Sequence, residues 1–269
     1  MAIVILGHDQ GRILASVENP PLVRQGDVQI VEVPQPGFEA TPDHGLGDVV
    51  PALANPAFQE VMAGLTRSGA RDGYRILVAD SAESPEEEPP LASEIRRRCD
   101  AIVLCAPRMA GSVLAGMVAG LQPLVLVNRP GGPPGVPSPS IDYQRGIVAL
   151  ARHLHELGHR EVAYLGGPPL SASNISRARG LADAERLLPG LHLRPLGDGA
   201  SARAGLAAAD AVHRSGVTAV MAYNDLGAIG VVHGLRALGL RVPEDVSVTG
   251  FDDVPLARFL SPPLTTAAA

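Results

Sequence analysis

The stretch from Gly47 to Phe58, GDVVPALANPAF, has the pattern of a strand that leads into a helix. Residues 48–50 form a short extended run, and Asn55 followed by Pro56 supplies an N-cap and a proline at the first helical position. Apolar side chains then recur at three-to-four spacing as far as Leu65, as they do on the buried face of an amphipathic helix. We therefore predict that a βα unit starts here.

The same alternation continues towards the end of the chain. Short apolar runs predict strands at residues 76–79, 101–104, 124–127, 162–165, 217–222 and 246–248. Amphipathic segments predict helices around residues 94–96 and over 111–120, 143–157, 179–188, 202–213 and 226–238. Because the strand runs are continuously apolar, they are typical of parallel sheets that helices cover on both faces. The sequence therefore predicts an α/β protein made of doubly wound parallel-sheet lobes.

A break in this rhythm divides the chain. Residues 129–137, RPGGPPGVP, cannot form a helix or a central strand, because proline removes backbone donors and glycine favours turns. We interpret this segment as the crossover between an N-terminal lobe, residues 46–129, and a C-terminal lobe, residues 130–269. Open α/β sheets bind ligands outside the carboxyl ends of their strands, so two such lobes predict a ligand cleft between them.

Residues 1–45 do not follow the alternation of strands and helices. This segment contains two arginines against six acidic residues, and proline interrupts each periodic stretch apart from one candidate strand at residues 28–31. We predict an irregular acidic N-terminal extension.

The composition is that of a globular protein and excludes several kinds of chemistry. Hydrophobic residues make up 46% of the chain, and all 22 basic residues are arginine, which excludes a catalytic or phosphate-binding lysine. The net charge of −6 does not indicate the positively charged surface that binds nucleic acid. No apolar run approaches the roughly 20 residues that a membrane helix needs. The start lacks a basic leader and the chain has only two cysteines, so we expect a cytoplasmic protein without membrane contact.

Seven segments in a fixed order match the signatures of one protein family. They are GDVVPALANPAF at 47–58, GHREVAYLGG at 158–167, the S-x-S-x-x-x-R-x-x-G arrangement at 171–180, YNDLGA at 223–228, VPEDVSV at 242–248, GFDD at 250–253 and SPPLTT at 261–266. Together they resemble the effector-sensing part of the LacI/GalR family of bacterial transcription regulators over about residues 47–266. The resemblance implies a periplasmic-binding-protein-like fold of type I that binds a small effector, a sugar or related polyol.

The resemblance also implies effector binding by Arg177, Asn224 and Asp252, which match the family motifs in place. Their chemistry suits hydroxyl groups. A guanidinium is a planar group of hydrogen-bond donors, a carboxylate can accept two hydrogen bonds, and an amide can both donate and accept. Each residue also has a structural interpretation. Arg177 could be a surface helix residue, Asn224 an N-cap and Asp252 a turn residue.

Three residues of the N-terminal lobe are further candidates for effector binding. Phe58 could offer a flat apolar face to a sugar ring, and a core position on the first helix explains it nearly as well. Asp80 ends the second predicted strand and Arg129 begins the crossover, so both are expected at the rim of the cleft. The chain departs from the family at Ala52 and Ala57, where an acid and an aromatic residue are usual, which predicts a wider pocket or a different ligand.

The expected partners also follow from the resemblance. The family joins its sensor to a helix-turn-helix that reads operator DNA as a dimer, which implies operator DNA and a homodimer here. Residues 1–45 contain no recognisable helix-turn-helix, and the family continues beyond PPLTT, whereas this chain stops at Ala269. The first interpretation is a transcription regulator; the second is a stand-alone binding protein or a truncated regulator without DNA binding. For an enzyme, we can assemble no nucleophile with its base, no metal site and no cofactor motif, so we expect none of these.

Overall fold

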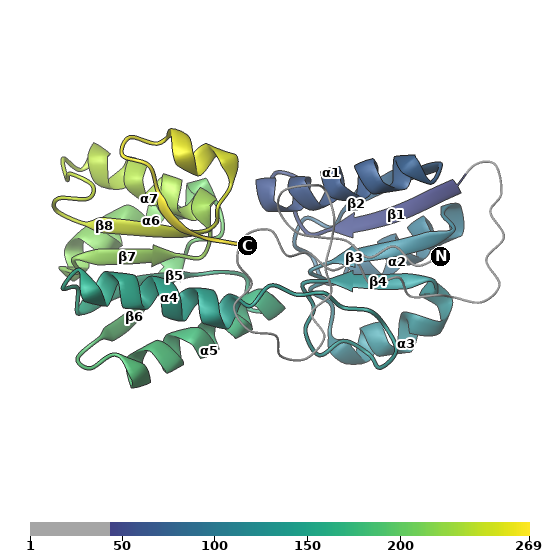
Figure 1. Ribbon diagram of the computed structural model, residues 1–269, viewed down its shortest axis with the longest axis horizontal. Helices are drawn as coiled ribbons and strands as arrows, with labels where there is room; N and C mark the ends of the chain where they lie inside the picture. The colour runs from purple at the N-terminus through teal and green to yellow at the C-terminus, as the bar shows by residue number, and fades with distance from the viewer. Residues whose placement is uncertain (1–43) are drawn as a thin grey trace. The chain divides into compact units, whose positions relative to one another are not determined.

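The computed structural model describes residues 44–269, which form two compact units; the first ends at Ser140 and the second begins at Ile141 (Figure 1). Both units are α/β, with parallel sheets of four and five strands. The predicted fold class, two doubly wound parallel-sheet lobes, is therefore confirmed. The predicted N-terminal extension lies outside the described residues, apart from its last two.

The N-terminal unit consists of four strands and three helices. In chain order these are β1 (His44–Val50), α1 (Pro56–Arg71), β2 (Tyr74–Asp80), α2 (Glu88–Arg98), β3 (Ala101–Cys105), α3 (Gly111–Leu121) and β4 (Leu124–Val127). All pairings are parallel and the strand order is β2-β1-β3-β4. The helix start predicted from the sequence is confirmed, because the Asn55 side chain accepts a hydrogen bond from the Ala57 backbone N–H at 3.1 Å, with Pro56 as the first helical residue.

The strands of this unit bury side chains on both faces of the sheet. In β3, Ile102 and Leu104 belong to the core formed with α2 and α3, whereas Val103 and Cys105 belong to the core formed with α1. Successive strand residues point to opposite faces, so a strand covered on both sides must be apolar throughout. This explains the continuous apolar runs of the sequence.

The C-terminal unit consists of five strands, four α-helices and one short 3-10 helix. In chain order these are α4 (Tyr143–Glu156), β5 (Glu161–Gly166), α5 (Ala172–Leu187), β6 (His192–Asp198), α6 (Ala202–Ser215), β7 (Ala219–Ala222), α7 (Asp225–Ala237), β8 (Ser247–Asp252), the 3-10 helix η1 (Pro255–Phe259) and β9 (Thr265–Ala268). The strand order is β6-β5-β7-β8-β9, again with parallel pairing throughout. Helices α4 and α5 cover one face, and α6 and α7 cover the other.

Helices α6 and α7 approach each other so closely that side chains would not fit between them. A Cβ atom on Gly205 of α6 would collide with the backbone of Gly227, and one on Gly230 of α7 would collide with the backbone of Ala202. Glycine is therefore required at these positions by the approach of two backbones. The contact fixes the start of α7, where part of the candidate site lies.

The proline-rich segment after β4 contains neither helix nor strand, as predicted for residues 129–137. It runs back beside the end of β4, where the Leu126 N–H donates to the Pro137 carbonyl at 2.9 Å and the Asn128 N–H donates to the Pro139 carbonyl at 2.8 Å. Proline lacks an N–H but keeps its carbonyl, so this segment can satisfy β4 as an acceptor only.

Two edge strands of the C-terminal unit were not predicted from the sequence. Strand β6 contains Pro195 and Gly197, and its residues alternate irregularly between exposed and buried, so no apolar run marks it. Proline is tolerated there because β6 lies at the edge of the sheet. Strand β9, with the sequence TTAA, is equally weak in pattern and pairs with β8 at the other edge.

The strand orders locate the edge at which ligands of such sheets bind. In each unit the chain goes from a central strand to one neighbour and then crosses to the other side, so the order reverses between β1 and β3 and between β5 and β7. Ligands bind at such switch points, outside the carboxyl ends of the strands.

Across residues 44–269, none of the helices is both long and apolar enough to cross a lipid bilayer.

Candidate functional site

Arg177 lies in the second turn of α5 and is almost completely buried, with 2% of its surface exposed. Its guanidinium carbon lies 4.1 Å from the ring centre of Tyr143, 4.3 Å from that of Tyr223 and 4.4 Å from that of Phe251. Each ring face attracts a cation by up to about 2 kcal/mol when the pair is desolvated. The sequence suggested either a ligand-binding fork or a surface arginine, and the structure shows a core arginine inside an aromatic cage.

The cage leaves the guanidinium with little conventional hydrogen bonding. Its Nε and Nη1 atoms are buried without a hydrogen-bond partner, and Nη2 lies 3.5 Å from the Oδ1 atom of Asp252. The structure therefore brings together two of the three residues that were expected to bind the effector in this unit. The positive charge of Arg177 lies next to the carboxylate of Asp252.

Asp252 is the last residue of β8, and its backbone adopts a conformation that side chains rarely take. Its φ angle is 107°, and the next residue, Asp253, has a φ angle of 53°. Such angles cost a non-glycine residue of order 1–3 kcal/mol and persist only where the surroundings impose them. The side chain of Asp252 keeps 9% of its surface exposed, at the carboxyl end of the strand.

Asp225, a buried residue at the start of α7, binds the chain on either side of these two residues. Its carboxylate accepts hydrogen bonds from the Val254 N–H at 2.8 Å and from the Thr266 hydroxyl at 2.6 Å, and also from the Phe251 N–H. Burial raises the pKa of Asp225 to about 6, although these donors act in the opposite direction. A Cβ atom on Gly250 would collide with this carboxylate. Asp225 thus connects the end of β8, the chain that follows it and β9.

Asn224 is the N-cap of α7, the structural role considered from the sequence. Its Oδ1 atom accepts from the Gly227 N–H at 2.8 Å, and its Nδ2 atom donates to the Ala200 carbonyl at 3.0 Å. Both ends of the amide are engaged by the backbone, and only 2% of the residue is exposed.

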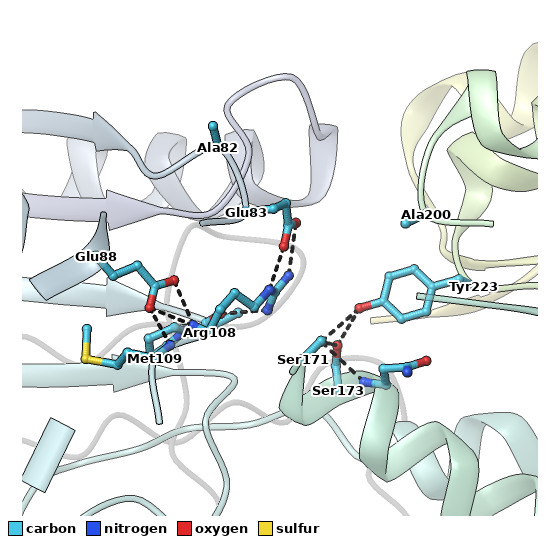
Figure 2. A network of polar contacts seen from close by, with 12 residues as sticks. Ala82, Glu83, Glu88, Arg108, Met109, Ser171, Ser173, Ala200 and Tyr223 are labelled. Atoms are coloured by element: carbon cyan, nitrogen blue, oxygen red, sulfur yellow. Dashed lines mark hydrogen bonds and ion pairs between the residues drawn. The ribbon is translucent and has the colours of Figure 1, made fainter. Parts of the chain in front are cut away.

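A buried cluster of hydroxyl groups, not anticipated from the sequence, adjoins the aromatic cage (Figure 2). The Tyr223 hydroxyl lies 2.7 Å from the Ser173 Oγ atom and 3.1 Å from the Ser171 Oγ atom, and the two serine hydroxyls are 2.7 Å apart. Ser171 also caps α5 by accepting from the Asn174 N–H. The motif S-x-S followed by arginine four residues later could have revealed this cluster, because it places both hydroxyls in the first turn of the helix that carries Arg177.

The three candidates of the N-terminal unit occupy separate positions within it. Phe58 lies on α1 and is half-buried against the core cluster that includes Leu65. Asp80 accepts hydrogen bonds from the Leu53 N–H at 3.0 Å and the Ala82 N–H at 2.8 Å, so each of its carboxylate oxygens binds a backbone N–H group.

Arg129, the third candidate of this unit, holds the loop between β3 and α3. It donates to the carbonyls of Pro107 and Met109, each at 2.9 Å. Burial lowers the pKa of Arg129, with the nearby Glu88 opposing that shift and the nearby Arg108 adding to it. The guanidinium is thus used to fix this loop.

Sequence reasoning missed a charged network at the carboxyl end of this unit's sheet. Figure 2 shows the Arg108 guanidinium facing the carboxylate of Glu83, with an Nε–Oε2 distance of 2.6 Å and an Nη2–Oε1 distance of 3.1 Å. The buried carboxylate of Glu88 accepts from the backbone N–H groups of Arg108 and Met109 at 2.6–2.8 Å. Arg108 follows β3 by three residues, so the rule that sites lie at carboxyl strand ends could have identified it.

Strained backbone conformations gather at these same strand ends. Among the described residues, six that are not glycine have a positive φ angle, and each lies at or just beyond the carboxyl end of a strand: Ala82, Glu83, Ala106, Asn128, Asp252 and Asp253. Non-glycine residues in such conformations cluster at binding and active sites. In each unit, this points to the carboxyl end of the sheet as the functional edge.

Comparisons with known proteins agree with this geometry. The family model described as "Periplasmic binding protein-like domain" matches residues 151–269. The HTH-type transcriptional repressor CytR of Escherichia coli is 28% identical over 228 residues, which cover 82% of this chain and 66% of the relative. An uncharacterised HTH-type transcriptional regulator of Streptomyces limosus is 31% identical over 234 residues, with the same shares covered. The chain thus spans about two thirds of the length of these relatives.

Solved structures give the same result. A LacI family transcriptional regulator from Lactobacillus casei, solved with bound glucose, matches with a TM-score of 0.75 and 25% identity. The match covers 83% of this chain and 86% of that one. The relatives and this neighbour are named as transcription regulators, not as enzymes.

Proposed function

We propose, from the premise that this chain belongs to the LacI/GalR family of bacterial transcription regulators, that it senses a small hydroxyl-rich effector such as a sugar. Asp252 is the residue that binds hydroxyl groups directly, and Arg177 and Asn224 complete the effector-binding set of the C-terminal unit. The glucose bound to the Lactobacillus casei regulator supports this class of ligand.

The observation that carries the proposal is the placement of Asp252. A carboxylate accepts hydrogen bonds through two oxygens and suits a pair of adjacent hydroxyls on a sugar. Asp252 lies at the carboxyl end of β8, is held in a costly backbone conformation, and has the buried charge of Arg177 3.5 Å behind it. The attraction of an opposite charge at this distance helps to fix the orientation of the carboxylate.

The other residues act mainly by shaping this position. The Asn224 amide is engaged by backbone at both ends, so its part in binding is to fix the start of α7 beside the site. In the N-terminal unit, Phe58 is the candidate that can offer an apolar face, while Asp80 and Arg129 order the loops that follow β2 and β3. That the two units bind one effector between them stays a prediction of the family resemblance.

Regulation of transcription by this effector would require two partners, which we include in the proposal. Operator DNA is proposed because the relatives are named as HTH-type regulators, and a second copy of the chain is proposed from the family resemblance. Any helix-turn-helix lies outside the described residues. A salt-dependent shift of operator DNA by the whole regulator, relieved or strengthened by the effector, would establish regulation; binding of effector without any effect on DNA would leave only sensing.

A thermal-shift screen against glucose, ribose and sucrose tests the proposal. A ligand that binds only the folded state adds about 2.7 kcal/mol of stability at 100 times its dissociation constant. We expect at least one sugar to raise the melting temperature of the wild type but not that of the Asp252→Asn variant. The matched control is Asp210→Asn on α6, which removes the same charge from an exposed position and is expected to respond like the wild type. The proposal fails if no sugar stabilises the wild type.

A further inference from the structure

The turn after β2 holds an acidic side chain in an unfavourable backbone conformation. The Ser84 N–H donates to the Ser81 carbonyl at 2.9 Å, and the two residues between them, Ala82 and Glu83, have φ angles of 50° and 62°. Positive φ angles at both central residues define the type I′ turn, which strongly prefers glycine and asparagine. This turn has neither.

The conformation of Glu83 is imposed by its surroundings. Its backbone N–H donates to the carbonyl of Pro51 at 2.7 Å, just beyond the end of β1, which ties the turn to the neighbouring strand. Glycine would satisfy this backbone without strain, because it has no Cβ atom. Glutamate at such a position indicates that the side chain itself has a use.

Arg108 fixes the direction of the Glu83 carboxylate. The guanidinium meets both carboxylate oxygens with its Nε and Nη2 atoms, and its Nη1 atom donates to the Ala106 carbonyl at 2.6 Å. A bidentate arginine–carboxylate pair is geometrically specific, so it orients the acceptor as well as binding it. The arginine side chain is 4% exposed, whereas the glutamate side chain is 36% exposed.

The carboxylate keeps acceptor capacity on its outer side. An ionised carboxylate has about four lone-pair sites, and Arg108 uses one on each oxygen of Glu83. The remaining sites belong to a side chain that is more than one third exposed. They can accept two hydroxyl hydrogen bonds, which is the arrangement that a pair of neighbouring hydroxyls on a polyol requires.

The same design occurs in the C-terminal unit. Asp252 ends a parallel strand and Glu83 follows one by three residues, each has a positive φ angle, and each is paired with an arginine that is less than 5% exposed. We propose that Glu83, oriented by Arg108, is a second ligand-binding carboxylate that accepts hydrogen bonds from the hydroxyl groups of a polyol. This inference rests on the proposed function and adds a binding residue to it.

An ion pair that served stability alone would not need these features. The favourable place for a purely structural glutamate is a helix or an ordinary turn, not a type I′ turn that costs backbone energy at two residues. Arg108 also has a carbonyl partner besides Glu83 and borders a loop that Glu88 already fixes. Stability therefore leaves the strained position of Glu83 unexplained, whereas ligand binding explains it.

Calorimetric titration of the whole chain with the sugar that gives the largest thermal shift among glucose, ribose and sucrose tests this assignment. We expect Glu83→Gln to raise the dissociation constant by about tenfold or more, the size typical of a lost hydrogen bond to a charged group. The matched control is Glu87→Gln, four residues later and exposed, which removes the same charge and is expected to bind like the wild type. Glu83→Gly serves as a second variant, because glycine suits the backbone of the turn and keeps the chain folded.

A series of deoxy analogues of that sugar separates direct contact from a structural effect. In the wild type, removal of the hydroxyls that Glu83 binds should weaken binding, and in Glu83→Gln the same removal should cost nothing further. If every deoxy analogue loses the same affinity in both proteins, Glu83 acts only through the fold and the assignment is overturned. Wild-type affinity in both Glu83 variants overturns it as well.

The two levels of the proposal fail in different ways. If none of the three sugars binds to the wild type, the proposed function fails and the role of Glu83 falls with it. If a sugar binds and Asp252→Asn weakens it while the Glu83 variants do not, the proposed function stands and only the second carboxylate is rejected.

Discussion

The two units hold a carboxylate at the carboxyl end of a strand by different means. In the C-terminal unit, three aromatic rings enclose Arg177, whose Nε and Nη1 atoms lack hydrogen-bond partners, and Asp252 lies 3.5 Å away. In the N-terminal unit, Arg108 forms a bidentate ion pair with Glu83 and donates to the Ala106 carbonyl. The Nε–Oε2 and Nη2–Oε1 distances of the ion pair are 2.6 and 3.1 Å. One arginine is positioned by packing and the other by hydrogen bonds.

This difference predicts how each pair responds to change. A side chain enclosed by rings is part of the core, so removing it leaves a cavity and an uncompensated carboxylate at once. A side chain held by hydrogen bonds beside an exposed carboxylate can be removed at lower cost, because the carboxylate can turn to water.

Arg177→Ala is expected to cause the largest loss of stability, about 5 kcal/mol, because it empties the aromatic cage and unpairs Asp252. Arg108→Ala is expected to cost only about 1–2 kcal/mol, the value of its net hydrogen bonds. Urea unfolding of both variants with the same denaturant slope would measure the difference. Equal losses, or a larger loss for Arg108→Ala, would show that the two arginines are held alike.

A second contrast concerns the two buried aspartates, Asp48 and Asp225. Asp225 has three donors, whereas Asp48 in β1 is fully buried with only the Cys105 thiol at 3.3 Å, and its Oδ2 atom has no partner. Burial raises the pKa of Asp48 from 3.8 to about 7, with the Cys105 hydrogen bond opposing it. Asp48 therefore prefers its neutral form in the folded chain.

The raised pKa of Asp48 makes stability depend on pH. Between about pH 4 and 7 the unfolded chain has released the Asp48 proton and the folded chain has not, so the free energy of unfolding falls as pH rises through this window. The loss is on the order of 4 kcal/mol. Asp48→Asn should make this part of the profile shallower and stabilise the protein at pH 8. The raised pKa of Asp225 contributes a smaller fall of the same sign between about pH 4 and 6, which remains in this variant. Asp225→Asn should instead destabilise the protein, because the amide cannot accept all the hydrogen bonds of the carboxylate. Thermal unfolding from pH 4 to 8 measures both, and an unchanged slope in Asp48→Asn would refute the assignment.

Tyr223→Phe tests whether the hydroxyl cluster supports the cage. The ring and its contact with Arg177 remain, but Ser171 and Ser173 each lose a partner in a buried position. We expect a loss of about 1–2 kcal/mol in the free energy of unfolding. Ser215→Ala is a control outside the site, because the Ser215 hydroxyl donates to the nearby Val212 carbonyl and accepts from the Val217 N–H. A loss no larger than that of the control would separate the hydroxyls from the stability of the cage.

The smallest effect is expected for the exposed ion pair beside the site. Arg258 lies 3.0 Å from Asp253, with 64% and 25% of their side chains exposed. Water screens such a pair, so Arg258→Ala should change stability by about 0.5 kcal/mol or less. A loss above about 1 kcal/mol in chemical unfolding would mean that this pair helps to hold the strained turn at Asp252.

The sequence allowed most of the fold to be predicted, because the elements that carry it have strong local patterns. Asn55 before Pro56 marked the start of α1, and the apolar runs of β3, β4 and β5 marked central strands. The edge strands β6 and β9 were missed because an edge strand has only one neighbour and tolerates proline and weak apolar patterning.

The candidate site was predicted less completely, because its geometry depends on contacts between distant residues. The rings around Arg177 come from positions 143, 223 and 251, and no local pattern indicates that they converge. Glu83 and Arg108 are 25 residues apart, and nothing in the Ala82-Glu83 sequence signals a left-handed turn. Motif matching identified Arg177 and Asp252, while their pairing and the cage became evident only in the structure.

The most direct test of effector sensing through Asp252 is a calorimetric titration of the wild type and of Asp252→Asn with glucose, ribose and sucrose. We predict saturable binding of at least one sugar to the wild type, and a dissociation constant at least about tenfold higher in the folded variant. Equal affinity in the two proteins, or no binding to a folded wild type, would contradict it.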